Sequence, residues 1–308
     1  MTFDASKPAI LFPGQGAQAP GMGVWLCQNH SIANELFSRA EEVLGYDLKA
    51  LCADGPAEKL NETVHSQPAL FVVGVAAARV YEQTQPEIAA RIAATAGLSL
   101  GEYTSVCFAG GLSFEDGLRL VQKRGDAMQA CADAVESGMS SVLGLDLEKL
   151  TEVCELSREG DEILQPANLL CPGNIAVSGH LSALGRIEPH AAAAGAMKVV
   201  PLSVAGAFHT PLMQDAVAAL TTALSEVTIN ATRIPVYSNV DAKPHQEPDE
   251  IRDLLAKQVV NPVLWEASIR QMIDDGFDGF LEAGTGRVLR GTIKRIARKT
   301  PTDGFGDE

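Results

Sequence analysis

The chain has 308 residues, of which 46% are hydrophobic and 20% charged, a composition that predicts a globular protein with a sizeable core in one large domain or two. Its formal net charge of −15 disfavours nucleic acid as a partner, because phosphate binding needs a basic surface. The six cysteines are scattered without C-x-x-C spacing, which argues against a zinc site or a thioredoxin-like redox centre and makes reduced thiols the expectation.

In chain order, residues 1–7 carry no charged-then-apolar signal pattern, and no apolar run in the chain approaches the ~20 residues that a membrane helix needs. We therefore expect no membrane association and a cytoplasmic location. Pro8–Phe12 then predicts a buried strand, which the glycine-rich turn Pro13–Gln18 follows.

Helical patterns at Ser31–Leu44 and Gln67–Val80 precede a small apolar run at Ile92–Ala96, which predicts a second strand. Strands that alternate with helices predict a parallel α/β sheet. Ligands of such sheets bind outside the carboxyl ends of the strands. We therefore expect a site where the first glycine turn and the residues after Ala96 meet.

Gly97-Leu98-Ser99-Leu100-Gly101 follows the second predicted strand and leads into a helical pattern. This is the arrangement of a nucleophile elbow, in which a tight strand-to-helix turn strains the serine backbone and requires small neighbours. The pattern alone is weak in a chain with 28 glycines. Its context makes Ser99 a candidate covalent nucleophile.

The middle of the chain predicts a second unit, of the order strand, helix, strand, strand, helix, strand, which is typical of a ferredoxin-like unit inserted into a larger domain. We therefore predict a large discontinuous subdomain of residues 1–131 and 206–308 and a small subdomain of residues 132–205. The four strands of the small unit are expected at Gly138–Leu145, Ile163–Leu170, Asn174–Gly179 and Met197–Leu202.

The last third of the chain is expected to return to the large sheet at Pro235–Val240 and Gly279–Ala283 and to end in a loose tail at Gly304–Glu308. A serine nucleophile needs a base within hydrogen-bond reach, and histidine has a pKa suited to that work. His209 lies in a small-residue turn from which a side chain can project into a cleft, so it is the candidate base, with a structural role as the open alternative. The other histidines stand in polar or helical surroundings: His30, His65, His180, His190 and His245.

Six segments of the chain stand in the same order as the motifs of a known family. They are Gly14-Gln15-Gly16-Ala17-Gln18, Gly97–Tyr103, Lys123–Gln129, Ala207-Phe208-His209, Gln258–Val263 and Glu282–Gly286. Through them, residues 10 to about 296 resemble the malonyl-CoA:acyl carrier protein transacylases. The resemblance implies an α/β fold, with a hydrolase-like core around a mainly parallel sheet and an inserted ferredoxin-like α+β subdomain.

The resemblance implies a role for each matching residue. Ser99 would be acylated by malonyl, and His209 would take the serine proton and later return one to the departing thiol. The backbone carbonyl of Gln258 would orient the histidine in place of an aspartate, and the backbone amides of Gln15 and Leu100 would stabilise the oxyanion. A plain strand-to-helix turn at Gln15 and a plain helix end at Gln258 stay open as alternatives.

The resemblance also implies the acyl pocket. Arg124, in a helical pattern over Leu118–Ala130, would bind the free malonyl carboxylate, because a planar guanidinium can hold a carboxylate bidentately. Phe208 would crowd the α-methyl branch of a larger acyl group. Met128, one helical turn beyond Arg124, would line the pocket, although core packing explains it equally well, and Asn168 is a loose match to a pocket-lining segment.

Two residues depart from the commonest pattern of the family. Leu98 stands where a histidine usually precedes the serine, and Thr285 stands where a proline is frequent. Neither change removes a group to which the resemblance gives a catalytic role. Leu98 puts in doubt any part played by a polar neighbour of the serine.

The reaction implied by the resemblance is a ping-pong transfer of malonyl from CoA, through a malonyl-serine, to the phosphopantetheine thiol of acyl carrier protein, for fatty acid biosynthesis. No cofactor or metal is implied, because the thioester supplies the reactivity and the glycine turns lack G-x-G-x-x-G spacing. Malonyl-CoA and an acidic acyl carrier protein would be the partners. A serine hydrolase or thioesterase, a polyketide-pathway acyltransferase and a non-catalytic binding protein stay open as alternatives. The carrier protein would dock on the densest basic cluster, which a solvated helix face explains equally well: Lys294, Arg295, Arg298 and Lys299.

Overall fold

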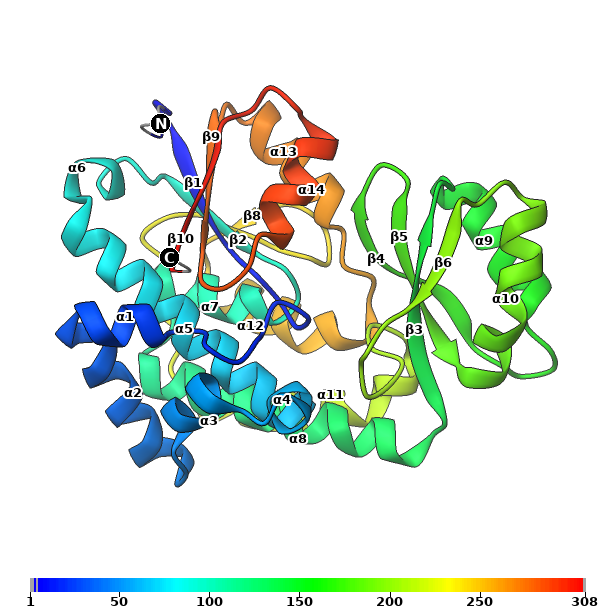
Figure 1. Ribbon diagram of the computed structural model, residues 1–308, viewed down its shortest axis with the longest axis horizontal. Helices are drawn as coiled ribbons and strands as arrows, with labels where there is room; N and C mark the ends of the chain where they lie inside the picture. Colours follow the sequence, from blue (N-terminus) through cyan, green and yellow to red (C-terminus); the bar gives the residue numbers. More distant parts are fainter. Residues whose placement is uncertain (1–2, 4, 307–308) are drawn as a thin grey trace.

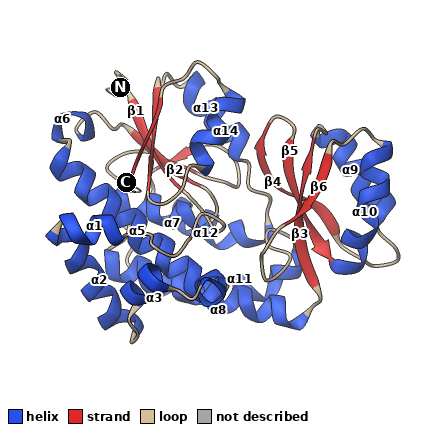
Figure 2. Ribbon diagram, in the orientation of Figure 1, coloured by secondary structure: helices blue, strands red, loops and turns tan. Residues whose placement is uncertain are grey.

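The computed structural model describes residues 3 and 5–306, and it places a large unit beside a smaller one, each built on its own sheet (Figures 1 and 2). The strands of the large sheet are β1 (Pro8–Phe12), β2 (Ala94–Gly97), β7 (Val236–Tyr237), β8 (Pro244–His245), β9 (Gly279–Ala283) and β10 (Thr302–Phe305). The strands of the small sheet are β3 (Ser137–Leu143), β4 (Leu164–Cys171), β5 (Asn174–His180) and β6 (Lys198–Pro201).

The helices connect these strands in both units. Those before β3 are α1 (Val24–Asn29), α2 (Ser31–Leu44), α3 (Leu48–Asp54), α4 (Ala57–Asn61), α5 (Thr63–Thr84), α6 (Pro86–Ala89), α7 (Leu100–Phe108) and α8 (Phe114–Ala134). Those after β3 are α9 (Leu147–Ser157), α10 (Leu181–Ala193), η1 (Pro211–Met213), α11 (Gln214–Ser225), α12 (Pro248–Lys257), η2 (Gln258–Val260), α13 (Trp265–Asp274) and α14 (Val288–Ile296).

The large sheet has the strand order β10-β9-β1-β2-β7-β8, and every pairing in it is parallel except that of β7 with β8. The carboxyl ends of β1 and β2 are therefore neighbours, with Phe12 paired to Gly97. Because the chain leaves both strands at this edge, the glycine turn after β1 and the turn after β2 meet there, as the sequence predicts.

The small unit has the element order β3, α9, β4, β5, α10, β6, and its antiparallel sheet has the strand order β4-β5-β3-β6. Helices α9 and α10 cover the face of this sheet that points away from the large unit (Figure 2). The α/β fold class, with a mainly parallel sheet and an inserted α+β unit, is thus confirmed. The small unit's elements lie within the predicted residues 132–205, and the boundary residues themselves stay a prediction.

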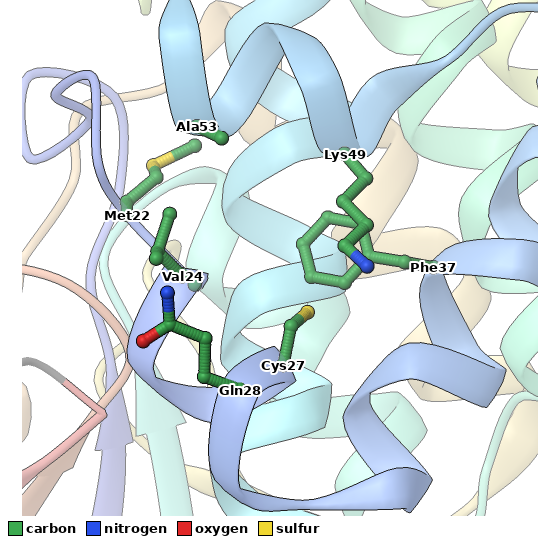
Figure 3. Close-up of a pocket in the computed structure, with 8 residues that line it drawn as sticks. Met22, Val24, Cys27, Gln28, Phe37, Lys49 and Ala53 are labelled. Carbon is green, nitrogen blue, oxygen red and sulfur yellow. The ribbon is translucent and has the colours of Figure 1, made fainter.

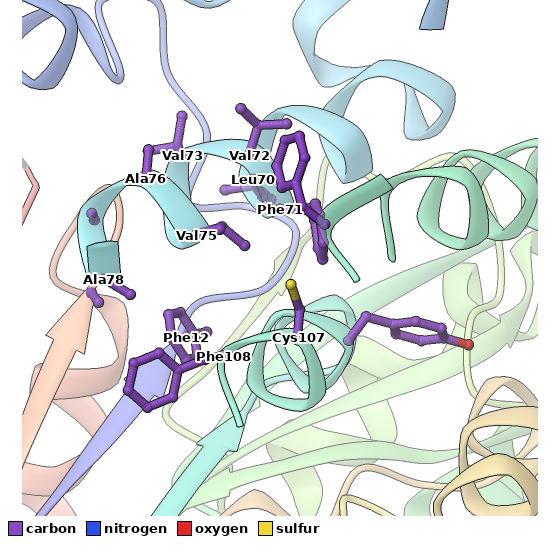
Figure 4. Packing of buried hydrophobic residues seen from close by; sticks show 14 of the residues in the cluster. Phe12, Leu70, Phe71, Val72, Val73, Val75, Ala76, Ala78, Cys107 and Phe108 are labelled. Atoms are coloured by element: carbon purple, nitrogen blue, oxygen red, sulfur yellow. The ribbon is translucent and has the colours of Figure 1, made fainter. Parts of the chain in front are cut away.

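Alternate residues of β1 serve two different cores, as the period of a strand buried on both faces requires. Ile10 and Phe12 pack with helices α2, α5, α7 and α8, whereas Ala9 and Leu11 pack with α13 and α14 on the other face. Figure 4 shows Phe12 against Phe108 of α7 and the residues of α5 above them. This packing holds α7, and with it the turn after β2, firmly against the sheet.

Helix α5 begins four residues earlier than the Gln67 start that the sequence predicts, so that Pro68 lies inside it. A proline in this position has no N–H to donate to the carbonyl of Val64. The side chain of Gln122 on α8 donates to that carbonyl instead, with Nε2 3.2 Å from the oxygen. A residue distant in sequence therefore compensates for the proline.

The predicted loose tail at Gly304–Glu308 is wrong for its first residues. Thr302–Phe305 forms β10, which pairs with β9 in parallel register, and Phe305 packs edge-on against Tyr81 of α5. The tail is ordered by pairing with a strand about twenty residues earlier, a contact that local composition does not report. Residues 307–308 lie outside the described residues.

Candidate active site

Ser99 lies in the turn between β2 and α7 and has a φ of 50°, which residues other than glycine rarely adopt. Two glycines make this turn possible. A Cβ atom on Gly97 would lie 1.9 Å from the carbonyl carbon of Gly101, and one on Gly101 would lie 2.1 Å from the carbonyl oxygen of Phe12. The chain therefore crosses itself at a distance that only glycine permits, and Ser99 stands partly exposed at the carboxyl edge of the sheet.

The turn after β1 packs directly against this elbow. A Cβ atom on Gly14 would lie 2.3 Å from the carbonyl oxygen of Leu98. Gln15, the next residue, is partly exposed, and Leu100 is the first residue of α7. The two turns that carry the predicted oxyanion amides are thus in contact, and the role of the amides of Gln15 and Leu100 stays a prediction.

His209 lies beside Ser99, with Nε2 2.8 Å from the serine Oγ. Its Nδ1 is 2.9 Å from the backbone carbonyl of Gln258, which can only accept a hydrogen bond. Nδ1 must therefore carry the proton, which leaves Nε2 free to accept from the serine hydroxyl. The structure therefore brings Ser99, His209 and Gln258 together in the arrangement that the family resemblance implies.

The ring of His209 is fully enclosed, and this burial lowers its pKa. Burial and the neighbouring charge of Arg124 lower the pKa of His209 from 6.5 to about 4. The imidazole is therefore neutral at pH 7, the state that a general base requires.

The side chain of Gln258 holds the site together. Its Nε2 donates to the carbonyl of Ser99 (2.9 Å) and to Oε2 of Glu102 (2.6 Å). Its Oε1 accepts from Nη2 of Arg124 (2.9 Å). Because these partners have fixed polarity, the amide has one possible orientation. The side chain thereby fixes the position of the carbonyl that orients His209.

Arg124 extends from α8 into the site and is 1% exposed. Its Nη2 lies 2.9 Å from Ser99 Oγ, and its Nη1 lies 2.9 Å from Oε1 of Gln67. The guanidinium also lies over the ring of Tyr103, 5.5 Å from the ring centre. Burial lowers the pKa of Arg124, although the group remains a cation at any physiological pH.

The charge of Arg124 has no ion-pair partner within residues 5–306. Its Nε is buried and has no hydrogen-bond partner among the described residues. A buried cation in this state is costly unless an anion reaches it. The site is therefore suited to a substrate that brings a carboxylate to within a few ångströms of Ser99.

Met128 and Phe208 belong to one buried cluster beside the site. Nε2 of Gln67 lies 3.6 Å from the sulfur of Met128, so Gln67 links this cluster to Arg124. Asn168 lies on β4, where it forms a bridge with Val263, and its buried Oδ1 has no partner in the described part of the chain. Among the described residues, no hydrogen bond joins Asn168 to Ser99, His209 or Arg124.

The two departures from the family pattern are buried. Leu98 is 7% exposed and packs among apolar residues such as Leu11 and Val263, behind the elbow. An apolar side chain suits these surroundings. Thr285 is likewise buried, next to Gly284 with a φ of 125°.

The basic cluster is exposed, at the end of α14 and in the turn beyond it. Nη2 of Arg295 donates to the carbonyl of Pro172 in the β4–β5 turn, at 2.9 Å. This arginine therefore ties the large unit to the small one. Lys294, Arg298 and Lys299 project from the same end of the helix or the turn that follows it.

Three residues of the site were missed by sequence reasoning. Gln67 and Glu102 are fully enclosed polar side chains that contact the machinery, and Asn239 stands in the turn after β7. One signal could have found Asn239. It lies near the carboxyl end of the strand predicted at Pro235–Val240, at the edge of the sheet where the ligand site was expected.

A separate cavity lies in the helical part of the large unit. Figure 3 shows this cavity, of about 270 Å³, between α1, α2 and α3, toward which the thiol of Cys27 points. Burial raises the pKa of Cys27, so the reactive thiolate is scarce. Among the described residues, no group of three or more acidic, histidine or cysteine side chains could hold a metal ion, and no helix is long and apolar enough to span a membrane.

Residues 10–301 match the family described as the acyl transferase domain, which places the chain among the acyltransferases. A malonyl CoA-acyl carrier protein transacylase of Salmonella typhimurium is 40% identical over 288 residues, which cover 94% of this chain and 92% of that protein. The chain belongs to the malonyl-CoA:acyl carrier protein transacylase family, and the resemblance found in the sequence is confirmed.

Solved structures agree with this assignment. The structure of the malonyl CoA-acyl carrier protein transacylase from Coxiella burnetii has a TM-score of 0.94 at 36% identity and covers 98% of this chain and 95% of that one. A malonyl-transacylase in complex with a type II PKS acyl-carrier protein has a TM-score of 0.93, also at 36% identity, and covers 98% of this chain and 97% of that one.

Proposed function

We propose that this enzyme transfers a malonyl group from coenzyme A to the thiol of an acyl carrier protein, through a malonyl ester on Ser99. The observation that carries the proposal is the position of Arg124, a buried cation with no ion-pair partner among the described residues. Its Nη2 lies 2.9 Å from the serine Oγ. A serine nucleophile next to this guanidinium is suited to an acyl group that ends in a carboxylate.

In the first half-reaction, Nε2 of His209 takes the proton of the Ser99 hydroxyl while Oγ attacks the thioester carbonyl. The negative charge on the carbonyl oxygen is stabilised by the backbone amides of Gln15 and Leu100. The carbon–sulfur bond then breaks, and His209 gives its proton to the departing CoA sulfur. Malonyl-serine and free CoA thiol remain.

The second half-reaction reverses these steps with another thiol. His209 takes the proton of the carrier-protein thiol, whose sulfur attacks the ester carbonyl, and the carbon–Oγ bond breaks. The proton on His209 returns to Oγ of Ser99. One imidazole serves both half-reactions, and the proposal needs no metal or cofactor, because the thioester supplies the driving force.

The selectivity for malonyl comes from Arg124. An acetyl group has no carboxylate, so acetyl-CoA would leave the cation buried without an anion. Phe208, buried next to His209, limits the space for an α-methyl branch. Malonyl satisfies both conditions.

We place the reaction in fatty acid biosynthesis, with a polyketide pathway as the alternative, and we place the enzyme in the cytoplasm. The relatives named as malonyl CoA-acyl carrier protein transacylases support the reaction. The six cysteines are all unpaired thiols, which supports a reducing compartment. The acidic carrier protein is proposed to dock at the end of α14, on Lys294, Arg298 and Lys299.

The test is the intact mass of the protein after incubation with malonyl-CoA or acetyl-CoA. The parent should gain one malonyl group and little acetyl. Ser99→Ala should gain neither, and Arg124→Ala should lose its preference for malonyl over acetyl by 10- to 100-fold, the scale of a lost charge-assisted contact.

Two results would count against the proposal. A malonyl adduct on Ser99→Ala would rule out the nucleophile, and an unchanged acyl preference in Arg124→Ala would rule out the carboxylate site. Rapid loss of malonyl to water without any thiol would instead indicate a hydrolase. Conversion of the adduct by carrier-protein thiol at a rate far above hydrolysis supports transfer.

A further inference from the structure

The side chain of Asn239 binds the backbone of the elbow on both sides of Leu98, directly before the serine. Its Oδ1 accepts from the backbone N–H of Ser99 at 2.6 Å, and its Nδ2 donates to the carbonyl of Gly97 at 2.8 Å. Backbone groups have fixed polarity, so the amide has one orientation only. If β7 continued beside β2, its backbone would make two hydrogen bonds to these groups. The side chain of Asn239 makes both of them instead.

The position of Asn239 follows from the sheet order. Strand β7 pairs with β2 only through Val236 and Tyr237, and the chain then turns away at Ser238. Asn239 is 0% exposed and stands where the next ladder residue would have been. Its own backbone is held as well, since Leu264 donates to its carbonyl at 2.8 Å.

The conformation of Ser99 needs such support. A residue other than glycine with a φ of 50° is strained, and strain of this kind persists only where the surroundings over-determine the backbone. Ser99 is also the residue before α7, and its own side chain makes no capping bond. The two hydrogen bonds of the Asn239 side chain therefore fix the position of Ser99 Oγ relative to His209.

Glu102 connects Asn239 to Gln258, the residue that orients His209. Its Oε2 accepts from the backbone N–H of Asn239 at 3.2 Å and from Nε2 of Gln258 at 2.6 Å. Gln258 in turn offers its backbone carbonyl to Nδ1 of His209. One buried carboxyl oxygen thus links the group that positions the nucleophile to the group that orients the base.

We propose that Asn239 and Glu102 are positioning residues for acyl transfer, which hold Ser99 Oγ and His209 Nε2 at attack distance through one shared hydrogen-bond network. Neither contacts the substrate. The inference rests on the proposed function, because it presumes that Ser99 and His209 are the nucleophile and the base. It assigns a purpose to two buried polar residues that the reaction steps themselves do not use.

The experiment measures the single-turnover rate of malonyl-serine formation against malonyl-CoA concentration. Asn239→Ala and the isosteric Asn239→Asp should both lower the maximal rate about 100-fold, the effect of a misplaced reacting group. Asn239→Asp keeps an acceptor for Ser99 but sets a carboxylate oxygen against the carbonyl of Gly97. The half-saturating concentration should change less than threefold, because Arg124 still holds the malonyl carboxylate.

Glu102 is tested with a pair of variants. Glu102→Gln keeps an acceptor oxygen and should retain at least a third of the acylation rate, whereas Glu102→Ala should lose about 100-fold. Ser157→Ala is the control for loss of a buried hydrogen bond, since it removes the donor to the carbonyl of Val153 (2.7 Å) in α9 of the small unit. It should acylate at the parent rate even if its melting temperature falls.

The outcomes separate the two proposals. Parent-like acylation in folded Asn239→Ala, or equal losses in Glu102→Gln and Glu102→Ala, would overturn the positioning roles and leave the proposed function standing. A malonyl adduct on Ser99→Ala would overturn the proposed function instead. A fall in rate matched by an equal rise in the half-saturating concentration would indicate a substrate-binding role and would also overturn the inference.

Discussion

Arg124 acts on both members of the catalytic pair at once. Its Nη2 donates to Ser99 Oγ, and its charge is one of the two causes that lower the pKa of His209. A malonyl carboxylate on Arg124 would neutralise this charge just as the histidine has to accept a proton. In the proposed reaction, the bound malonyl carboxylate would therefore make His209 a stronger base, and an acyl group without a carboxylate would not.

This coupling predicts the pKa of His209 in Arg124→Ala. The pKa should rise above the parent value of about 4 but stay below the ordinary 6.5, because burial, the larger cause, remains. Proton NMR titration of the histidine ring measures it, with His209→Gln to assign the signal. His245→Gln, which changes a partly exposed histidine outside the site, is the control. An unchanged His209 pKa in Arg124→Ala would refute the coupling.

The raised pKa of Glu102 predicts that the free energy of unfolding falls as the pH rises. Burial raises its pKa from 4.5 to about 7, so the folded protein binds this proton more tightly than the unfolded chain does. Its contribution to the free energy of unfolding is full below pH 4.5 and is lost as the pH rises through 7. Glu102→Gln should therefore be more stable than the parent at pH 8, by at most about 3 kcal/mol.

Urea denaturation of the parent and Glu102→Gln at pH 8 and pH 5.5 checks this expectation. The advantage of the variant should shrink at pH 5.5, where Glu102 is largely protonated. His209, whose pKa is lowered, contributes a slope of the opposite sign to both proteins and so cancels in the comparison. A constant difference at the two pH values would contradict the prediction.

Sequence reasoning could select candidate site residues where a local pattern marks them. Ser99 stands in a glycine pattern and His209 in a small-residue turn, and the structure brings both together with Gln258. Asn239 and Glu102 escaped because their importance comes from contacts across more than 130 residues, such as the one between Asn239 and Ser99. A lone asparagine or glutamate has no local signal that distinguishes it from a solvated one.

At the scale of elements, the crossing of β1, β2 and α7 decides the geometry of the site. Gly101 lets the first turn of α7 pass over the end of β1, where a Cβ would lie 2.1 Å from the carbonyl oxygen of Phe12. The carbonyl oxygen belongs to the backbone, and the Cβ would be bonded directly to it. Neither atom can therefore move aside without a shift of the backbone. The elbow thus depends on a glycine that has no side chain to take part in the chemistry.

Gly101→Ala should therefore be destabilised by about 1–3 kcal/mol or more and should lose most of its acylation activity. Gly185→Ala is the matched control, because Gly185 lies in helix α10 and a Cβ there would meet no atom within 4 Å. That control should gain about 0.5–1 kcal/mol, the helix preference of alanine over glycine. Equal free energies of unfolding for the two variants would contradict the argument from close approach.

The elements themselves could be predicted where periodicity and glycine turns mark them, as for β1 and the strands of the small unit. Two deviations have tertiary causes. Helix α5 runs through Pro68 because Gln122 satisfies the carbonyl that the proline leaves free. Strand β10 forms because β9 offers it a partner. Neither partner could be identified from the segment itself.

At the scale of the whole molecule, the net charge of −15 opposes the approach of an acidic carrier protein. Docking therefore needs a local positive surface. We propose that the end of α14 supplies this surface. It lies beside the small unit, since the guanidinium of Arg295 reaches the β4–β5 turn. The remaining cations at this end are exposed.

Charge reversal of these cations should therefore weaken carrier-protein turnover selectively. In the triple variant Lys294→Glu, Arg298→Glu and Lys299→Glu, kcat/KM for the carrier protein should fall at least 10-fold at low salt, while acylation by malonyl-CoA stays within twofold of the parent. Arg295 is left intact because it joins the two units. Lys149→Glu, on exposed α9, is the control and should change neither rate. Because ions screen this attraction, the difference in kcat/KM between variant and parent should narrow as the salt concentration increases. Equal losses of rate with malonyl-CoA and with the carrier protein would exclude this surface as the docking site.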